Sequence, residues 1–153
     1  MKREPSLYPL SHDHHHGLVQ ASRLKNAGKP SSERTIKTIA SEFIEFWYSD
    51  LIRHFREEED YLLPVLLQYS SDHNVLISKT ILEHIDIRRS VLQLEEDLWR
   101  NIEIHLDNLH NIGKMLESHI RFEERELFPL IEEKVPSEEL ESINKIITSK
   151  MVG

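Results

Sequence analysis

A thirteen-residue pattern occurs twice in this sequence, at residues 54–66 and again at residues 119–131. Each copy begins with a histidine and continues with an arginine, a pair of glutamates, an apolar residue, a proline and further apolar residues, all at equal offsets. The first glutamate follows the histidine by four positions, which places both side chains on one face of an α-helix. Two helices with this pattern indicate two pseudo-equivalent halves around one shared site.

The remainder of the chain also reads as helices with short breaks, and signals for β-strands are nearly absent. We predict helices over about residues 11–26, from residues 31–33 to about 69, from a cap at Ser71 or Asp72 to about 98, from residues 99–103 to about 134, and over residues 136–149. A chain of 153 residues is long enough for one ordinary domain, which we place at residues 1–153. The expected fold is all-α: an antiparallel up-down four-helix bundle with a short C-terminal helix.

Composition and charge exclude several classes of function. The formal net charge of −8 argues against binding to nucleic acid or to an anionic membrane surface, since both need a basic face. The absence of cysteine removes disulfide scaffolds and thiolate metal sites, so any metal must be bound by nitrogen and oxygen. The N-terminus lacks the apolar core of a secretory signal, and no apolar stretch is long enough to span a bilayer. We therefore expect a cytoplasmic protein.

Four of the ten histidines fall on the apolar stripes of the four main predicted helices. These four are His14, His54, His84 and His119. Glu58 and Glu123 lie one turn after the second and the fourth of them. A buried, unpaired carboxylate costs roughly several kcal/mol, and two in one core would also repel each other. A pair of divalent cations would resolve both problems, with imidazoles as terminal ligands and the two glutamates as bridges.

Other readings of these residues remain open. A single histidine on an apolar stripe is more often a hydrogen-bonded core residue, so a metal-free helical interaction module is an alternative. His15 is a second candidate for the ligand on the first helix, and Arg88 either pairs with a glutamate near the site or extends toward solvent. The other histidines have no partner at ligand spacing and are expected at the surface or as caps: His12, His16, His73, His105 and His110. Five acidic residues are expected on solvated faces: Glu57, Glu59, Asp60, Glu124 and Glu126.

The order of these residues resembles the hemerythrin-like, or HHE cation-binding, family. From Asp-His-His-His-Gly-Leu at residues 13–18 to Pro129, the chain shows His, His-x-x-x-Glu, His and His-x-x-x-Glu on successive helices. The resemblance implies an up-down bundle with two iron ions, bridged by carboxylates and an oxo or hydroxo group. Carried over by position, the metal ligands are His14 (or His15), His54, Glu58, His84, His119 and Glu123. The donor atoms alone would also suit manganese or zinc.

Two departures bear on the function that the resemblance implies. Arg88 stands where the oxygen-carrying hemerythrins have a second histidine on the third helix, and His119-x-x-x-Glu123 replaces their His-x-x-x-x-Asp. The chain in this respect looks more like the iron-sensing and di-iron repair branches. We expect a non-haem di-iron protein that binds or senses dioxygen, nitric oxide or iron. The alternative is a di-iron redox enzyme or an iron-donating cluster-repair protein, and catalysis is the weaker reading because no acid–base pair or substrate pocket is evident.

Overall fold

The computed structural model describes residues 2–70, 72 and 74–152, and this part of the chain forms helices and no strand. The all-α prediction is therefore confirmed. The elements, in chain order, are η1 (Pro5–Leu7), α1 (Tyr8–Lys25), α2 (Ile36–Phe46), η2 (Trp47–Leu51), α3 (Ile52–Glu57), η3 (Glu58–Leu62), α4 (Leu63–Tyr69), α5 (Asn74–Trp99), α6 (Leu106–Phe122), η5 (Glu123–Leu127), α7 (Phe128–Lys134) and α8 (Ser137–Val152). None of the described helices is long and apolar enough to cross a membrane.

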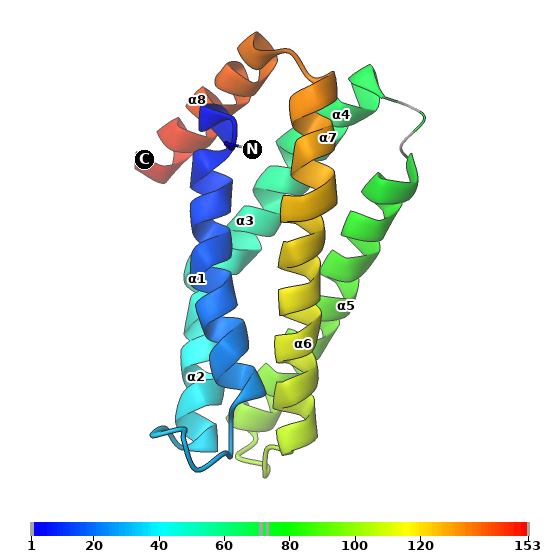
Figure 1. The fold of residues 1–153 in the computed structure, drawn as a ribbon. Helices are drawn as coiled ribbons and strands as arrows, with labels where there is room; N and C mark the ends of the chain where they lie inside the picture. Colours follow the sequence, from blue (N-terminus) through cyan, green and yellow to red (C-terminus); the bar gives the residue numbers. More distant parts are fainter. Residues whose placement is uncertain (1, 71, 73, 153) are drawn as a thin grey trace.

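Four long helical segments lie side by side in the molecule (Figure 1). They are α1, the run from α2 to α4, α5, and the run from α6 to α7. Helix α6 packs against both α1 and α5, while α2 packs against α1 and α5. The links at residues 26–35 and 100–105 lie at the same end of the molecule, and α8 packs against η1 near the opposite end (Figure 1).

Several predicted helix ends differ from the structure. Helix α1 begins at Tyr8 rather than near residue 11, because Pro9 suits the first turn of a helix, where its missing N–H is not needed. Helix α2 begins at Ile36 rather than at residues 31–33, because the Thr35 side chain caps it by accepting a hydrogen bond from the Thr38 N–H. The break near residues 99–103 is confirmed, and Asn101 has a φ of 55° there. The predicted cap at Ser71 lies outside the described residues.

The second and fourth segments contain π-helical turns that the sequence analysis did not predict: besides η2, the second has η3, and the fourth has η5. The turns η3 and η5 begin at Glu58 and Glu123, and a proline follows each glutamate by six positions. Proline has no N–H and its ring clashes with a preceding carbonyl, which favours a widened turn just before it. The wider turn shifts the buried position by one residue, so Leu62 is fully buried where an uninterrupted α-helix would bury Tyr61.

Buried side chains form two apolar clusters that are separated along every long segment by buried polar residues. In the second segment, Phe55 belongs to one cluster and Leu62 to the other; in the fourth, Leu116 and Leu127 divide in the same way. The buried polar residues between the clusters include the predicted inward histidines and glutamates. The fold thus places a polar layer across the middle of an apolar core.

Candidate metal centre

The structure brings six of the seven candidate ligands into one buried cluster. His14 comes from α1, His54 and Glu58 from the second segment, His84 from α5, and His119 and Glu123 from the fourth. All six are almost completely buried. Their donor atoms form two overlapping groups that could each hold a metal ion. The first contains His14, His54, Glu58 and Glu123, and the second contains Glu58, His84, His119 and Glu123.

His15 does not join either group. Its side chain is exposed, and its ring contacts that of His16, with 5.8 Å between centroids. Successive residues are rotated by about 100° around an α-helix, so the side chain after an inward His14 points away from the core. The structure thus favours His14 over His15 as the ligand from the first helix.

Part of the cluster has the spacing of metal ligands without hydrogen bonds between them. Nε2 of His84 lies 3.1 Å from Oε1 of Glu58, and Nε2 of His119 lies 3.5 Å from Oε2 of Glu123. These four buried atoms nevertheless have no hydrogen-bond partner in the described structure. Ligand atoms about 2.1 Å from one metal and at right angles to each other lie about 3 Å apart. Imidazole nitrogens and carboxylate oxygens at such distances, and without hydrogen bonds, fit the ligands of a transition metal.

The other ring nitrogen of each histidine faces a carboxylate on a neighbouring segment. Nδ1 of His54 lies 3.1 Å from Asp13, Nδ1 of His84 lies 2.6 Å from Glu59, and Nδ1 of His119 lies 2.8 Å from Glu83. Nδ1 of His14 lies 3.3 Å from Glu124, at ion-pair distance but outside hydrogen-bond geometry. A carboxylate only accepts hydrogen bonds, so these partners keep the hydrogen on Nδ1 and leave Nε2 for the interior.

This outer set of carboxylates corrects part of the sequence analysis. Glu59 and Glu124 were predicted on solvated faces, but they are half-buried and contact candidate ligands. Glu57 is also buried, where Arg53 donates a hydrogen bond to it. Asp60 and Glu126 are exposed, as predicted.

Asp13 and Glu83 were missed altogether, although the sequence contains a signal for them. Each directly precedes an inward histidine, just as Glu59 and Glu124 directly follow an inward glutamate. Acidic residues adjacent to predicted ligands are therefore candidates for partners of the ligands on the next helix.

Burial and charge act in opposite directions on these groups. Burial lowers the pKa of His84, but the adjacent carboxylates of Glu58 and Glu59 outweigh it and raise the pKa to about 9. For His54, burial is again outweighed, here by the charge of Glu58 and the hydrogen bond with Asp13, so its pKa lies well above the ordinary value. Burial raises the pKa of Glu123, but the charge of His119 and the hydrogen bond with His14 hold it well below the usual range. Without a metal the cluster therefore holds protons that metal binding must displace.

Aromatic rings close the cluster on two sides. The ring of Phe55 stacks on that of His84 at a centroid distance of 3.8 Å and meets His119 edge-on at 5.5 Å. The ring of Phe128 stacks on His14 at 5.1 Å. Trp47 in turn packs edge-on against Phe55, with 5.7 Å between the ring centroids. These rings exclude water from the candidate ligands.

Arg88 remains outside the cluster. Its guanidinium lies 3.7 Å from Glu59 and is about one-third exposed. It therefore pairs with a glutamate next to the site, which was one of its two predicted roles.

The remaining histidines are at the surface, with one correction. His12 and His16 are exposed but do have a partner at ligand spacing, since their Nε2 atoms lie 3.2 Å apart across one helical turn. His110 is half-buried, and its Nε2 donates to the carbonyl of Ala27, two residues beyond the end of α1. His105 is exposed, and His73 lies outside the described residues.

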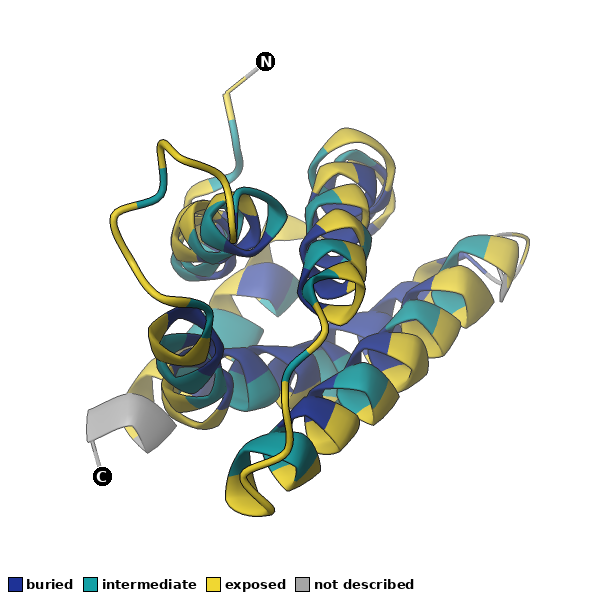
Figure 2. Ribbon diagram, turned by 90° about the horizontal axis from the view of Figure 1, so that it is seen from below, coloured by how far each residue is buried: buried dark blue, intermediate teal, exposed yellow. Residues whose placement is uncertain are grey.

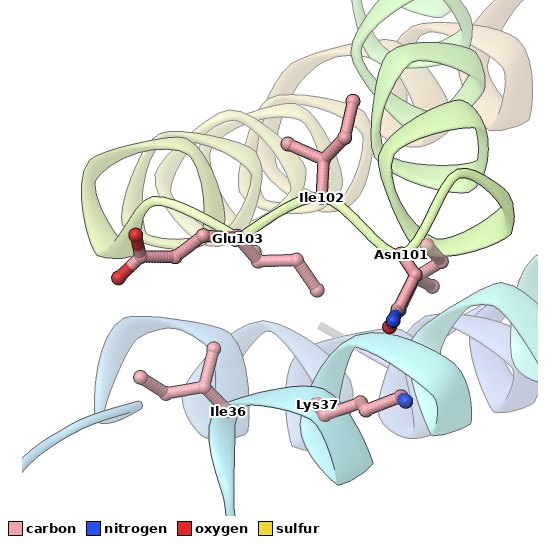
Figure 3. Close-up of a pocket in the computed structure, with 7 residues that line it drawn as sticks. Ile36, Lys37, Asn101, Ile102 and Glu103 are labelled. Atoms are coloured by element: carbon pink, nitrogen blue, oxygen red, sulfur yellow. The ribbon is translucent and has the colours of Figure 1, made fainter.

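Surface pockets lie away from this cluster. One of about 390 Å³ lies between the start of α2 and the link from α5 to α6, where Ile36, Lys37 and Asn101 line it (Figure 3). Its lining contains none of the candidate ligands. The buried cluster is therefore the better candidate for a functional site.

Comparison with known proteins agrees with this arrangement. A comparison with curated proteins gives no significant match. The family model of the hemerythrin HHE cation binding domain matches residues 7–131, a range that contains all six clustered residues and the four outer carboxylates. On the strength of this match over most of its length, the chain belongs to the hemerythrin HHE cation-binding domain family.

Proposed function

We propose that this protein binds two iron ions in the buried cluster and uses them to bind or sense dioxygen, nitric oxide or iron. The observation that carries the proposal is that the two four-residue groups share Glu58 and Glu123. Each group then has two imidazoles of its own, and both draw on the same two carboxylates. Two bridging glutamates between two ions would neutralise charges that are otherwise costly to bury.

The fold supports this proposal. We infer that residues 1–153 form a single domain in which the four long segments make an antiparallel up-down bundle. Two of the links lie at one end of the molecule (Figure 1). Each long segment contributes at least one residue to the cluster. The site requires all four segments at once, so metal binding and folding are expected to be coupled. A cytoplasmic location stays a prediction.

The ligands limit the choice of metal without fixing it. Four imidazoles and two carboxylates suit iron, manganese and zinc, and affinity alone does not select among them. Membership in a cation-binding family with hemerythrin in its name favours iron. Ferrous ions would supply electrons and open coordination positions to a diatomic ligand.

The residues around the cluster determine which kind of small ligand could reach the metal ions. Phe55 and Phe128 contact the candidate histidines and keep the cluster dry, which favours a small apolar ligand over a charged one. The outer carboxylates hold three of the four imidazoles by hydrogen bonds. Binding and sensing are therefore better supported than turnover, since a substrate larger than a diatomic molecule has no described pocket at the cluster.

Elemental analysis of the purified protein tests the proposal directly. We expect about two metal ions per chain, mainly iron, and a loss of at least one of them in Glu58→Gln. The exposed Glu126→Gln is the matched control, since it lies outside both groups, and should keep both ions. Fewer than one ion per chain in the unaltered protein would contradict the proposal.

Absorbance spectra separate binding from redox chemistry. The reduced, iron-loaded protein is mixed with oxygen and then returned to an oxygen-free buffer. A new absorbance band that disappears again on oxygen removal indicates reversible binding. An immediate change that persists indicates the redox-enzyme alternative instead.

A further inference from the structure

The outer side of α5 carries a stripe of exposed apolar side chains. Ile85, Leu92 and Trp99 are 42%, 52% and 86% exposed. They are spaced seven residues apart, which corresponds to two helical turns and places them on one side of the helix. Helix α5 lies at the edge of the molecule, with exposed residues along its outer side (Figure 2). Contiguous apolar surface of this kind marks interaction sites more often than free surface.

Charged residues of opposite sign lie on the two sides of Leu92 along the stripe. Arg89, which is exposed, precedes Leu92 by three residues, and the exposed Glu96 follows it by four. Ile85 and Trp99 lie equally far from Leu92, seven residues before and after it. When the helix is reversed about Leu92, apolar residues therefore fall on apolar positions. Each charged residue then falls near a position that carries the opposite charge.

This symmetry favours one particular partner. A second α5 that runs antiparallel places Trp99 against Ile85, Leu92 against itself, and Glu96 near Arg89. A parallel copy would instead place arginine against arginine and glutamate against glutamate, which is unfavourable. Tyr48 lies beside the stripe, because its hydroxyl donates a hydrogen bond to Glu95 on α5 at 2.8 Å. Its aromatic side chain is 53% exposed. Tyrosine, tryptophan and arginine are enriched in protein interfaces.

We propose that the outer face of α5 binds a second copy of this chain, antiparallel to it, with the two-fold axis at Leu92. The contact is isologous, because each α5 presents the same stripe to the other. The candidate ligand on α5, His84, is fully buried on a different face of the helix, roughly 80° around the axis from Leu92, so the interface does not include it. The dimer does not depend on the proposed function.

Solution mass measured over a range of protein concentrations tests the interface. We expect the purified protein to form a dimer, and Leu92→Glu to raise the dissociation constant about thirtyfold or more, because two like charges then meet at the axis. Leu67→Glu is the matched control, since Leu67 is 48% exposed on α4, and it should leave the dimer unchanged. Circular dichroism verifies that both variants remain folded. A monomer at all concentrations, or a dimer that Leu92→Glu leaves intact, overturns the proposal.

Cross-linking tests the orientation, and the chain is suited to it because it contains no cysteine. Leu92→Cys should form a disulfide with its own copy under mild oxidation, whereas Leu67→Cys should not. Ile85→Cys should link to Trp99→Cys when the two variants are mixed. It should not link to itself, because the two copies of residue 85 lie about 21 Å apart along antiparallel helices. Efficient self-linking of Ile85→Cys would indicate a parallel pair and contradict the proposal.

Discussion

Nδ1 of His84 lies 2.6 Å from a carboxylate oxygen of Glu59, the residue that directly follows Glu58. One helical segment thus provides both a candidate ligand and the group that orients a histidine on the next segment. The same relationship recurs around the cluster: Asp13 faces His54, Glu83 faces His119, and Glu124 faces His14. Each histidine therefore faces a carboxylate of the segment before it, with the fourth segment preceding the first, and three of the four contacts are hydrogen bonds.

Replacing one of these outer carboxylates should weaken metal binding without removing a ligand. We expect Glu59→Gln to lower the affinity for metal by about ten- to a hundredfold, because partners of ligand histidines typically contribute this much. Titration against a chelator of known affinity measures the change. Asp60→Asn is the control, since Asp60 is exposed and adjacent in sequence. Equal affinities for the two variants would show that the outer carboxylate has no such role.

The stability of the metal-free protein should depend on pH in a defined window. The pKa of His84 is raised to about 9 in the folded protein, compared with the ordinary histidine value of 6.5. A raised pKa contributes stability that is fully present below the unfolded value and is lost as the pH rises through the folded value. The metal-free protein should therefore lose stability, of the order of a few kcal/mol, between about pH 6.5 and pH 9. The raised pKa values of His14 and His54 act in the same direction.

Urea unfolding at several pH values measures this loss. The metal-loaded protein provides the contrast, because metal binding requires neutral imidazoles and is strengthened by rising pH. Glu59→Gln should move the window to lower pH by removing a carboxylate that raises the pKa of His84. A metal-free protein that becomes more stable between pH 6.5 and 9 would contradict this account.

The inner residues of the site were predictable from sequence because they obey helical periodicity. His54 and Glu58 are one turn apart and flanked by apolar positions, so their burial follows from spacing alone. The pairing of Glu59 with His84 is not accessible in this way, because it depends on how two segments are rotated against each other. The shift from Tyr61 to Leu62 depends on a π-helical turn, for which Pro64 was the only local sign.

Phe55 should protect the centre as well as fill the core. We expect Phe55→Leu to speed the oxidation of the reduced, metal-loaded protein by air, because it removes the ring that stacks on His84. Rapid-mixing absorbance measures the rate. Phe43→Leu is the control, since Phe43 is equally buried in the apolar cluster and contacts Phe46. Both variants should lose about 1 kcal/mol of stability, so a rate that changes equally in both would indicate a general loosening of the core.

Two glycines at the contact between α1 and α6 should respond differently to the same substitution. A Cβ atom at Gly113 would lie 2.9 Å from the carbonyl oxygen of Ala21 and 3.0 Å from Cβ of Leu24. At Gly17 it would meet only the flexible side chain of Ile120, whose Cδ1 atom lies 2.6 Å away. Alanine is favoured over glycine inside a helix by about 1 kcal/mol. At Gly17 we therefore expect a change near zero, because rotation of the Ile120 side chain can relieve the contact.

At Gly113 the clash is with backbone, so the two helices must move apart. We expect Gly113→Ala to lower the free energy of unfolding by about 1–3 kcal/mol despite the gain in helix propensity. Separation of α1 from α6 would also move His14 away from Glu123, which its Nε2 approaches to 2.8 Å, so metal affinity should fall in this variant and stay unchanged in Gly17→Ala. Urea unfolding and chelator titration of the two variants measure both effects. Equal losses of stability in the two variants would mean that the backbone at Ala21 moves as readily as the side chain of Ile120. In that case the close approach of α1 and α6 would not fix the position of His14.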